Sequence, residues 1–230
     1  MIAIIDYGMG NLASVSKAFA FVGGRARVTS DPAVVAKAKA VVFPGVGAFG
    51  EAMAELRKRR LVDPIVGSIR DGTPFLGLCL GLQLLFSSSE ESPGVKGLGV
   101  LPGRVRKFPA RAGLKVPHMG WNQLNVIARS EATKQTRFKR EIASLPLVAR
   151  NDGILRGVPE GAFMYFVHSF FAAPESPSAV VATTEYGCRF PSVVSNGERL
   201  WATQFHPEKS QKWGLRILKN FLNEVEGSAC

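Results

Sequence analysis

The chain has 230 residues, a length that suits one domain with a substantial hydrophobic core. Apolar residues make up 46% of it and charged residues 20%, and no apolar run approaches the ~18 residues that suggest a membrane span. The formal net charge of +11 is compatible with a nucleic-acid partner, but the two basic clusters, at 57–60 and 129–140, are not interleaved with aromatic residues, which favours a solvated or partner-docking face.

Cysteine usage and the N-terminus indicate the compartment. Cys79, Cys188 and Cys230 make an odd number, which argues against a disulfide framework. The first residues enter an apolar strand at once and lack the charged segment of a signal peptide. We therefore expect a cytoplasmic protein whose Cys79 stays a free thiol. The sequence has no Cys-x-x-Cys or His-rich spacing, so we predict neither a metal site nor a cofactor.

The chain opens with a strand–turn–helix pattern. Residues 2–6, four apolar residues followed by Asp6, predict a buried strand. Gly8-Met9-Gly10-Asn11 predicts a turn, and a helix is expected from about Leu12 to Val22. A Gly-x-Gly turn at this place could also form a dinucleotide-binding loop. That interpretation is weak because the third glycine is missing and no acidic residue ends the next strand, at 26–29.

A second unit of the same kind follows. Residues 40–43 predict a buried strand, and Pro44-Gly45-Val46-Gly47 predicts a loop in which glycine permits a close approach of the backbone. Helices are expected at about 49–60 and 62–71. A plain Gly-rich connection is the alternative interpretation of this loop.

The stretch from Pro74 to Leu85 carries the first chemical signal. A short apolar strand runs into Gly77-Leu78-Cys79-Leu80-Gly81, and an apolar helix begins at Leu80. This is the cysteine form of the nucleophile elbow, a sharp turn that lifts a nucleophile clear of the sheet. The positive end of the helix favours the thiolate, and the Leu80 N–H is placed to stabilise an oxyanion. A buried structural cysteine is the alternative.

The rest of the chain mixes short strands with loops. We expect a polar loop at 87–94, strands at 98–101, 105–108 and 118–124, a β-rich run at 161–173, strands near 180–184, 192–194 and 200–204, and a helix at about 210–225. Residues 127–153 have neither a helical nor a strand period.

His206-Pro207-Glu208 carries the second signal. A strand is expected to run into His206, and residues two apart in extended backbone point to the same side. His206 and Glu208 can therefore converge, and a base oriented by a carboxylate beside a cysteine is the arrangement of nucleophilic acyl transfer. A surface turn is the alternative for this tripeptide alone.

These two motifs together resemble the Cys-His-Glu triad of the class I glutamine amidotransferases. Four further stretches, at 6–11, 44–50, 117–122 and 165–170, resemble the glutaminase subunits that pass ammonia to a cyclase in histidine biosynthesis. The resemblance implies an α/β fold, flavodoxin-like, with an open, mostly parallel central sheet and helices on both faces. The match runs over nearly the whole chain except about residues 127–153. We therefore expect residues 1–230 to form one domain, and we interpret the stretch at about 127–153 as a surface insertion rather than a new binding arm.

The resemblance also implies roles for individual residues. It places the second oxyanion donor in the loop after residue 43, where we expect the Val46 N–H, with Gly45 giving the peptide freedom to turn. If that turn depends on a partner, the isolated chain would have low activity. Residues expected to bind glutamine are Gln83, Glu91, Ser169 and Phe170. Many relatives have Tyr in place of Phe170, a change that matters little if the contact is through the backbone.

The implied partner is a separate (β/α)8 cyclase subunit that forms a heterodimer with this chain, with glutamine as substrate. Residues expected at that interface are Asn11, His118, Trp121 and Lys209. Two alternatives remain open: the glutaminase of another synthase, for aminobenzoate, pyridoxal phosphate or nucleotide amination, and a non-catalytic homologue. The stretch at 117–122 argues against the first and the intact triad against the second.

Overall fold

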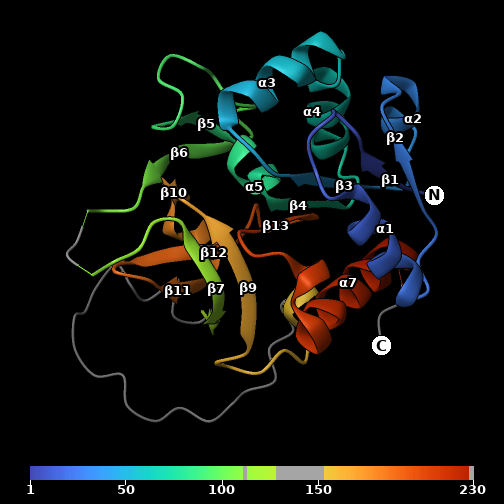
Figure 1. Ribbon diagram of the computed structural model, residues 1–230. Helices are drawn as coiled ribbons and strands as arrows, with labels where there is room; N and C mark the ends of the chain where they lie inside the picture. Colours follow the sequence, from blue (N-terminus) through green and yellow to red (C-terminus); the bar gives the residue numbers. More distant parts are fainter. Residues whose placement is uncertain (111–112, 128–152, 228–230) are drawn as a thin grey trace.

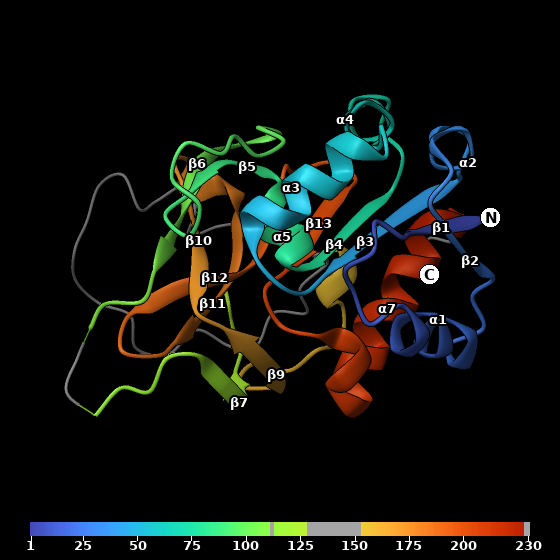
Figure 2. The same ribbon diagram turned by 45° about the horizontal axis from the view of Figure 1, so that its top comes forward.

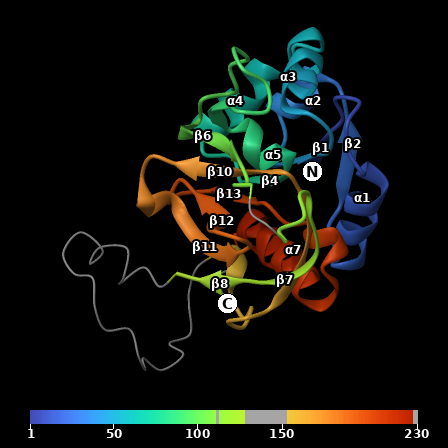
Figure 3. The same ribbon diagram turned by 60° about the vertical axis from the view of Figure 1, so that its left-hand side comes forward.

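A computed structural model of the chain describes residues 1–110, 113–127 and 153–227. Its centre is a sheet with the strand order β2-β1-β3-β4-β13-β12-β11-β8 (Figure 1). Strands β2 to β13 pair in parallel, whereas β12, β11 and β8 continue the sheet in antiparallel pairs (Figure 3). The strands are β1 Ile2–Ile5, β2 Ala26–Thr29, β3 Ala40–Gly45, β4 Phe75–Cys79, β8 Asn125–Val126, β11 Val180–Glu185, β12 Arg189–Ser195 and β13 Leu200–Thr203. The open, mostly parallel sheet expected from the sequence is thus confirmed.

Helices cover both faces of this sheet (Figure 2). They are α1 Leu12–Phe21, α2 Pro32–Ala36, α3 Phe49–Lys58, α4 Val62–Arg70, α5 Leu80–Leu84 and α7 Gln211–Glu226. Successive residues of a strand point to opposite faces. Val42 accordingly packs in one core cluster with α1 and α7, while Val41 and Phe43 pack in the other with α2, α3 and α4.

Two smaller sheets lie beside the central one. The first has the order β10-β6-β5 and the second pairs β7 with β9. Their bounds are β5 Phe86–Ser89, β6 Leu101–Lys107, β7 His118–Gln123, β9 Phe163–His168 and β10 Phe170–Pro174, and single 3-10 turns are η1 Gly153–Leu155, η2 Pro177–Ala179 and η3 Pro207–Lys209.

The structure corrects the sequence-based prediction in four places. The two strands expected at 98–101 and 105–108 are one strand, β6, and the polar loop expected at 87–94 begins as strand β5. The run at 161–173 is two strands that pair in different sheets and are separated by Ser169. Helix α2 was not expected; Asp31 accepts a hydrogen bond from the N–H of Ala33 and caps it.

The carboxyl ends of three parallel neighbours meet at one place. Gly45 at the end of β3 lies opposite Cys79 at the end of β4, and Thr203 at the end of β13 lies opposite Leu78. In open α/β sheets this edge is where ligands bind. Two segments 34 and 125 residues away from Cys79 in sequence, those of Gly45 and Gln204, are thereby brought beside it.

In the described part of the chain, no helix is long and apolar enough to span a membrane. The insertion expected at about 127–153 lies almost wholly outside the described residues.

Candidate active site

Cys79 occupies a strained turn between β4 and α5. Its backbone has φ 54° and ψ −106°, in a region that residues other than glycine rarely adopt. The turn also needs Gly81, because a Cβ there would lie 1.9 Å from the Phe43 carbonyl oxygen. The sulfur is therefore held by close packing of β3, β4 and α5 rather than by a flexible loop.

His206 and Glu208 form a buried pair. The Nδ1 of His206 is 2.8 Å from the Oε1 of Glu208, and the two side chains are 4% and 2% exposed. The convergence expected from the sequence exists, but its expected cause was wrong. Strand β13 ends at Thr203, and residues 207–209 form a 3-10 turn instead of extended backbone. The turn is fixed because Ser210 Oγ donates to the His206 carbonyl oxygen and accepts from the Tyr165 N–H.

The electrostatics of His206 tie it to the cysteine. Burial lowers the pKa of the imidazole, but the charge and hydrogen-bonding capacity of Cys79 and, after them, those of Glu208 raise the pKa to about 10. Its Nε2 is buried and has no hydrogen-bond partner in the described structure. The ring therefore keeps one nitrogen on the carboxylate and leaves the other for proton exchange.

Two glutamine side chains connect the sulfur to the next strand. The Nε2 of Gln83 donates to the Phe170 carbonyl oxygen at 2.8 Å and to the Oε1 of Gln204 at 3.2 Å. Because its oxygen is thus an acceptor, Gln204 turns its amide N–H groups toward the Cys79 sulfur, 3.7 Å away. Both N–H groups of Gln83 are engaged, which leaves its own amide oxygen for the pocket it lines.

His168 and His118 form a hydrogen-bonded chain that ends on the same carbonyl group. His168 Nδ1 lies 2.8 Å from the Phe170 oxygen and must donate, so its Nε2 accepts from His118 Nδ1 at 3.2 Å. His118 Nε2 in turn accepts from the side-chain amide of Asn122 at 3.2 Å. Burial lowers the pKa of His168 to about 3 and that of His118 to about 4, which agrees with two neutral rings.

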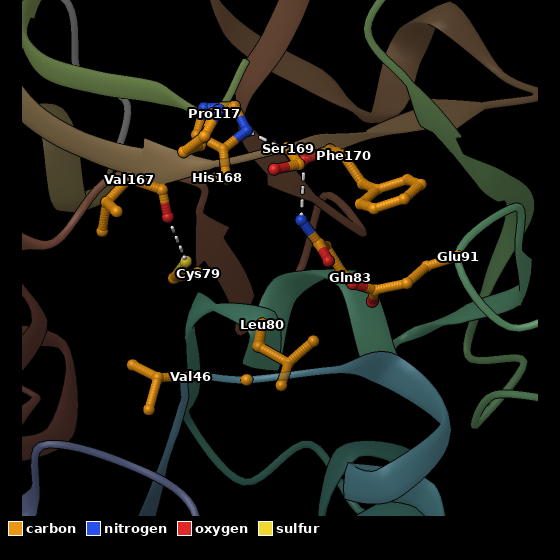
Figure 4. Close-up of a pocket in the computed structure, with 11 residues that line it drawn as sticks. Val46, Cys79, Leu80, Gln83, Glu91, Pro117, Val167, His168, Ser169 and Phe170 are labelled. Carbon is orange, nitrogen blue, oxygen red and sulfur yellow. Dashed lines mark hydrogen bonds between the residues drawn. The ribbon is translucent and has the colours of Figure 1, made fainter.

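A cavity of about 270 Å³ opens beside Cys79 (Figure 4). Figure 4 shows the Val167 carbonyl oxygen directed at the sulfur, 3.9 Å away, with Val46 and Leu80 on the other side of it. Seven of the residues predicted for the site line the cavity: Val46, Cys79, Leu80, Gln83, Glu91, Ser169 and Phe170. The other lining residues, which sequence reasoning missed, are Gly47, Pro117, Val167 and His168.

Glu91 has a second contact besides the cavity. Its Oε2 accepts a hydrogen bond from the Phe49 N–H at 2.8 Å, and Ser92 Oγ accepts from the Gly50 N–H at 3.0 Å. Helix α3 has no cap from its own Ncap residue, Ala48, so the 91–92 loop supplies it. Because α3 follows the loop that carries Val46, Glu91 links one wall of the cavity to that loop.

The remaining predicted residues lie outside the cavity. Gly45 is buried at the end of β3, and Asn11 caps α1 by accepting from the Ser14 N–H. Trp121 is 47% exposed, and Lys209 places its Nζ 5.7 Å from the centre of the Tyr165 ring. His118, expected at a partner interface, is instead 3% exposed. Sequence reasoning treated it as a residue near the surface because nothing local reveals the cluster of aromatic rings, including Phe166 and Tyr186, that stacks on it.

Residues that sequence reasoning missed share one property. Gln204 contacts Gln83 and Cys79, 121 and 125 residues away, and His168 contacts His118, 50 residues away, so no local spacing marks either residue. His168 had one usable signal, since it stands next to the two residues predicted to bind glutamine.

The arrangement is chemically specific. A cysteine at the start of a helix, a buried imidazole–carboxylate pair and a cavity that Gln83 and Glu91 help to line suit attack on a carbonyl carbon and passage through a thioester. Among the described residues, no group of three His, Cys, Asp or Glu side chains could hold a metal ion.

Comparison with known proteins agrees with this chemistry. Residues 3–225 match the family model of class I glutamine amidotransferases. The chain is 49% identical to imidazole glycerol phosphate synthase subunit HisH of Syntrophotalea carbinolica, over 96% of this chain and 98% of that protein. It is 48% identical to the protein of the same name from Methanothermobacter thermautotrophicus, over 98% and 99%.

Solved structures share the fold at lower identity. A glutamine amidotransferase crystal structure superposes with a TM-score of 0.69 at 18% identity, covering 99% of this chain and 100% of that one. A putative GMP synthase subunit from Thermoplasma acidophilum gives 0.66 at 17% identity, covering 98% and 94%.

Proposed function

The chain belongs to the class I glutamine amidotransferase family, and we propose that it is the glutaminase subunit of an imidazole glycerol phosphate synthase. The buried His206–Glu208 pair beside a cysteine on a strained elbow carries the chemical part of this proposal. The identity of 48–49% to two subunits of that enzyme, over nearly the full length, supports this synthase over other glutamine-dependent synthases.

In the proposed reaction, the Cys79 sulfur attacks the side-chain amide carbon of glutamine. His206 receives the cysteine proton and donates it to the leaving nitrogen, and Glu208, which contacts Nδ1, stabilises the protonated ring in between. Ammonia departs and a glutamyl thioester remains. Water, deprotonated by His206, then hydrolyses the thioester to glutamate and restores the thiol.

We assign the oxyanion of the tetrahedral intermediate to two backbone N–H groups. One is that of Leu80, the first residue of α5, where helical N–H groups have no intrahelical partner. The other is that of Val46, whose residue lines the same cavity. Gly45 allows the peptide before Val46 to rotate, so activity would be low until that rotation is completed.

The far end of the cavity suits the amino-acid end of glutamine. The carboxylate of Glu91 and the amide oxygen of Gln83 are acceptors for an ammonium group. Backbone groups of Ser169 and Phe170 would receive the carboxylate. Because this second contact is through the main chain, Phe at position 170 should serve as well as Tyr.

The ammonia needs a receiver, since in water it would be protonated and lost. We propose a separate (β/α)8 cyclase subunit that docks over the β7–β9 ribbon. Met119, Trp121 and Phe163 share one face of this ribbon and are 63%, 47% and 51% exposed. Val167, in β9, contacts the Cys79 sulfur through its carbonyl oxygen, so a partner at this ribbon would lie close to the chemistry. Asn11 and Lys209 are further exposed residues proposed for the interface.

The proposal extends to cell compartment and chain organisation. A reducing cytoplasm would keep Cys79 as a thiol. We propose that residues 1–230 act as a single catalytic domain in which about 127–153 is a tolerated insertion.

The decisive experiment measures glutamate release from glutamine, with and without the cyclase subunit and its phosphorylated ligand. The wild type should be strongly stimulated by the complex, and Cys79→Ala should abolish release in every condition. Cys188→Ala is the matched control, because it removes the other thiol of the described chain, which does not line the cavity. Glutamate release that persists in Cys79→Ala, or a wild type inactive with its cyclase, would refute the proposal.

A further inference from the structure

Tyr7, just after β1, buries a hydroxyl group that has no partner. The residue is fully buried, and its ring packs on Phe43 with the ring centres 5.6 Å apart. No hydrogen bond reaches its hydroxyl oxygen from any described atom. An unpaired buried hydroxyl lowers stability, and such groups in native proteins generally find a partner. A phenylalanine would fill the same core without this cost.

The hydroxyl rests against the hinge of the oxyanion loop. A Cβ built on Gly45 would lie 2.3 Å from the Tyr7 oxygen. Because a Cα–Cβ bond is about 1.5 Å long, the hydroxyl is within about 4 Å of the Gly45 Cα. Gly45 is the residue about which the peptide joining it to Val46 turns. Tyr7 thus has its polar atom beside the one backbone unit that must rotate.

The Tyr7 hydroxyl lies outside the cavity that Val46 lines. Tyr7 is fully buried and is not among the lining residues, whereas Val46 and Gly47 are. In a trans peptide the C=O and N–H groups point in opposite directions. When the Val46 N–H faces the cavity, the Gly45 carbonyl oxygen must therefore face away from it, into the packed interior where Tyr7 is buried.

We propose that Tyr7 is a positioning residue for the oxyanion donor: its O–H donates to the Gly45 carbonyl oxygen when the Val46 N–H faces the cavity. The inference rests on the proposed function and on the role given there to Val46. The hydroxyl is unpaired in the described structure, and in this proposal rotation of the peptide supplies the missing acceptor. Burial and, secondarily, the charge of Cys79 raise the pKa of Tyr7 well above its ordinary range, so the phenol retains the proton it donates.

The test is Tyr7→Phe, which removes one oxygen atom and keeps the ring. In the complex with the cyclase subunit and its ligand, kcat for glutamate release should fall by about fivefold to tenfold, the usual worth of one hydrogen bond, with KM within about twofold. The rate at which iodoacetamide alkylates Cys79 should not change, because that reaction needs the thiolate but no oxyanion donor. The melting temperature should stay the same or rise, since an unpaired hydroxyl is removed.

Tyr186→Phe is the matched control. Its hydroxyl donates to the Lys115 carbonyl oxygen at the surface, away from the cavity, so its kcat should equal that of the wild type. If kcat of Tyr7→Phe equals that of an active wild type, or falls only in step with alkylation of Cys79, the inference is overturned and the proposed function stands. A wild type without glutaminase activity overturns the proposed function and this inference together.

Discussion

Replacing Cys79 by alanine should lower the pKa of His206. Burial opposes protonation of this ring, and the charge and hydrogen-bonding capacity of Cys79, followed by those of Glu208, overcome it and raise the pKa to about 10. The imidazole is 4% exposed and the carboxylate 2%, so solvent and salt screen these interactions little. Alanine removes the sulfur without adding a new polar group.

The size of the fall in the pKa of His206 follows from the charge that the substitution removes. An opposite charge within about 4–6 Å changes a pKa by about 1–3, so the pKa of His206 should fall by that amount in Cys79→Ala. This corresponds to about 1.4–4 kcal/mol of interaction between the imidazolium and the thiolate. Glu208 still accepts from Nδ1, so the ring should remain easier to protonate than an ordinary histidine.

The assay is an NMR titration of the imidazole carbon signals. The chain contains three histidines, and burial lowers the pKa of His168 to about 3 and that of His118 to about 4. Only His206 should therefore titrate above about pH 6, which assigns the signal without further labelling. Cys188→Ala should leave the titration unchanged. If Cys79→Ala also leaves it unchanged, the imidazole is not paired with the sulfur and the proton transfer assigned to His206 is wrong.

Three further predictions concern stability and substrate binding. The pKa of His168 is about 3 in the folded chain and about 6.5 in the unfolded chain, so its contribution to stability is fully present above pH 6.5. As pH drops from about 6 to 3, the unfolded state takes up the proton first, and this ring should lower the free energy of unfolding by about 1.4 kcal/mol per pH unit. Urea titrations should show a less steep fall in His168→Asn. Glu91→Gln retains an oxygen that can cap α3 but loses the charge, so KM for glutamine should rise about tenfold or more while kcat stays within about threefold. Its control, Ser92→Ala, removes the neighbouring cap and should lower the free energy of unfolding by about 1 kcal/mol with KM unchanged. Gly81→Ala should lower the free energy of unfolding by at least about 3 kcal/mol, because its Cβ would lie 1.9 Å from a main-chain oxygen. Gly67→Ala, on α4, has open space around the new Cβ and should raise the free energy of unfolding by about 0.5–1 kcal/mol. Thermal or urea unfolding measures both.

Each of these has an outcome that would contradict it. An acid limb equally steep in His168→Asn would mean that other groups cause the acid loss. A KM that rises as much in Ser92→Ala as in Glu91→Gln would show that the loop matters for its shape and not for its charge. Equal stability of Gly81→Ala and Gly67→Ala would mean that the elbow is looser than the described backbone.

The local structure around the elbow was predictable because its cause is local. Apolar residues 75–79, flanking glycines and the following apolar run predict a strand, a sharp turn and a helix, and the structure has β4 and α5 there. The His206–Glu208 contact was also predicted, but through extended backbone. The chain instead makes a 3-10 turn, held by Ser210 and Tyr165, and one of those two residues lies 41 residues earlier in the sequence than His206. A hydrogen bond between distant parts of the chain thus fixes the backbone conformation of residues 207–209, which the sequence pattern alone could not predict.

The residues that sequence reasoning missed are those whose role depends on which strands become neighbours. The run at 161–173 was predicted as one β-rich stretch, but Ser169 interrupts it. Phe163–His168 pairs with β7 and Phe170–Pro174 pairs with β6, and nothing in the local sequence indicates that change of partner. That change of sheet turns the Phe170 carbonyl oxygen toward Gln83 and His168 at once.

The Phe170 carbonyl group, held by the N–H donors of Gln83 and His168, fixes the segment that we propose binds glutamine. On the opposite wall, the Gly45–Val46 peptide begins at a glycine, and the Tyr7 hydroxyl beside that glycine is unpaired. In our proposal the cavity therefore has one fixed wall that binds the substrate and a second wall whose Gly45–Val46 peptide rotates to bind the transition state. A partner that acts on the movable wall can raise kcat while KM stays nearly constant, because the groups that hold the ground state do not move with it.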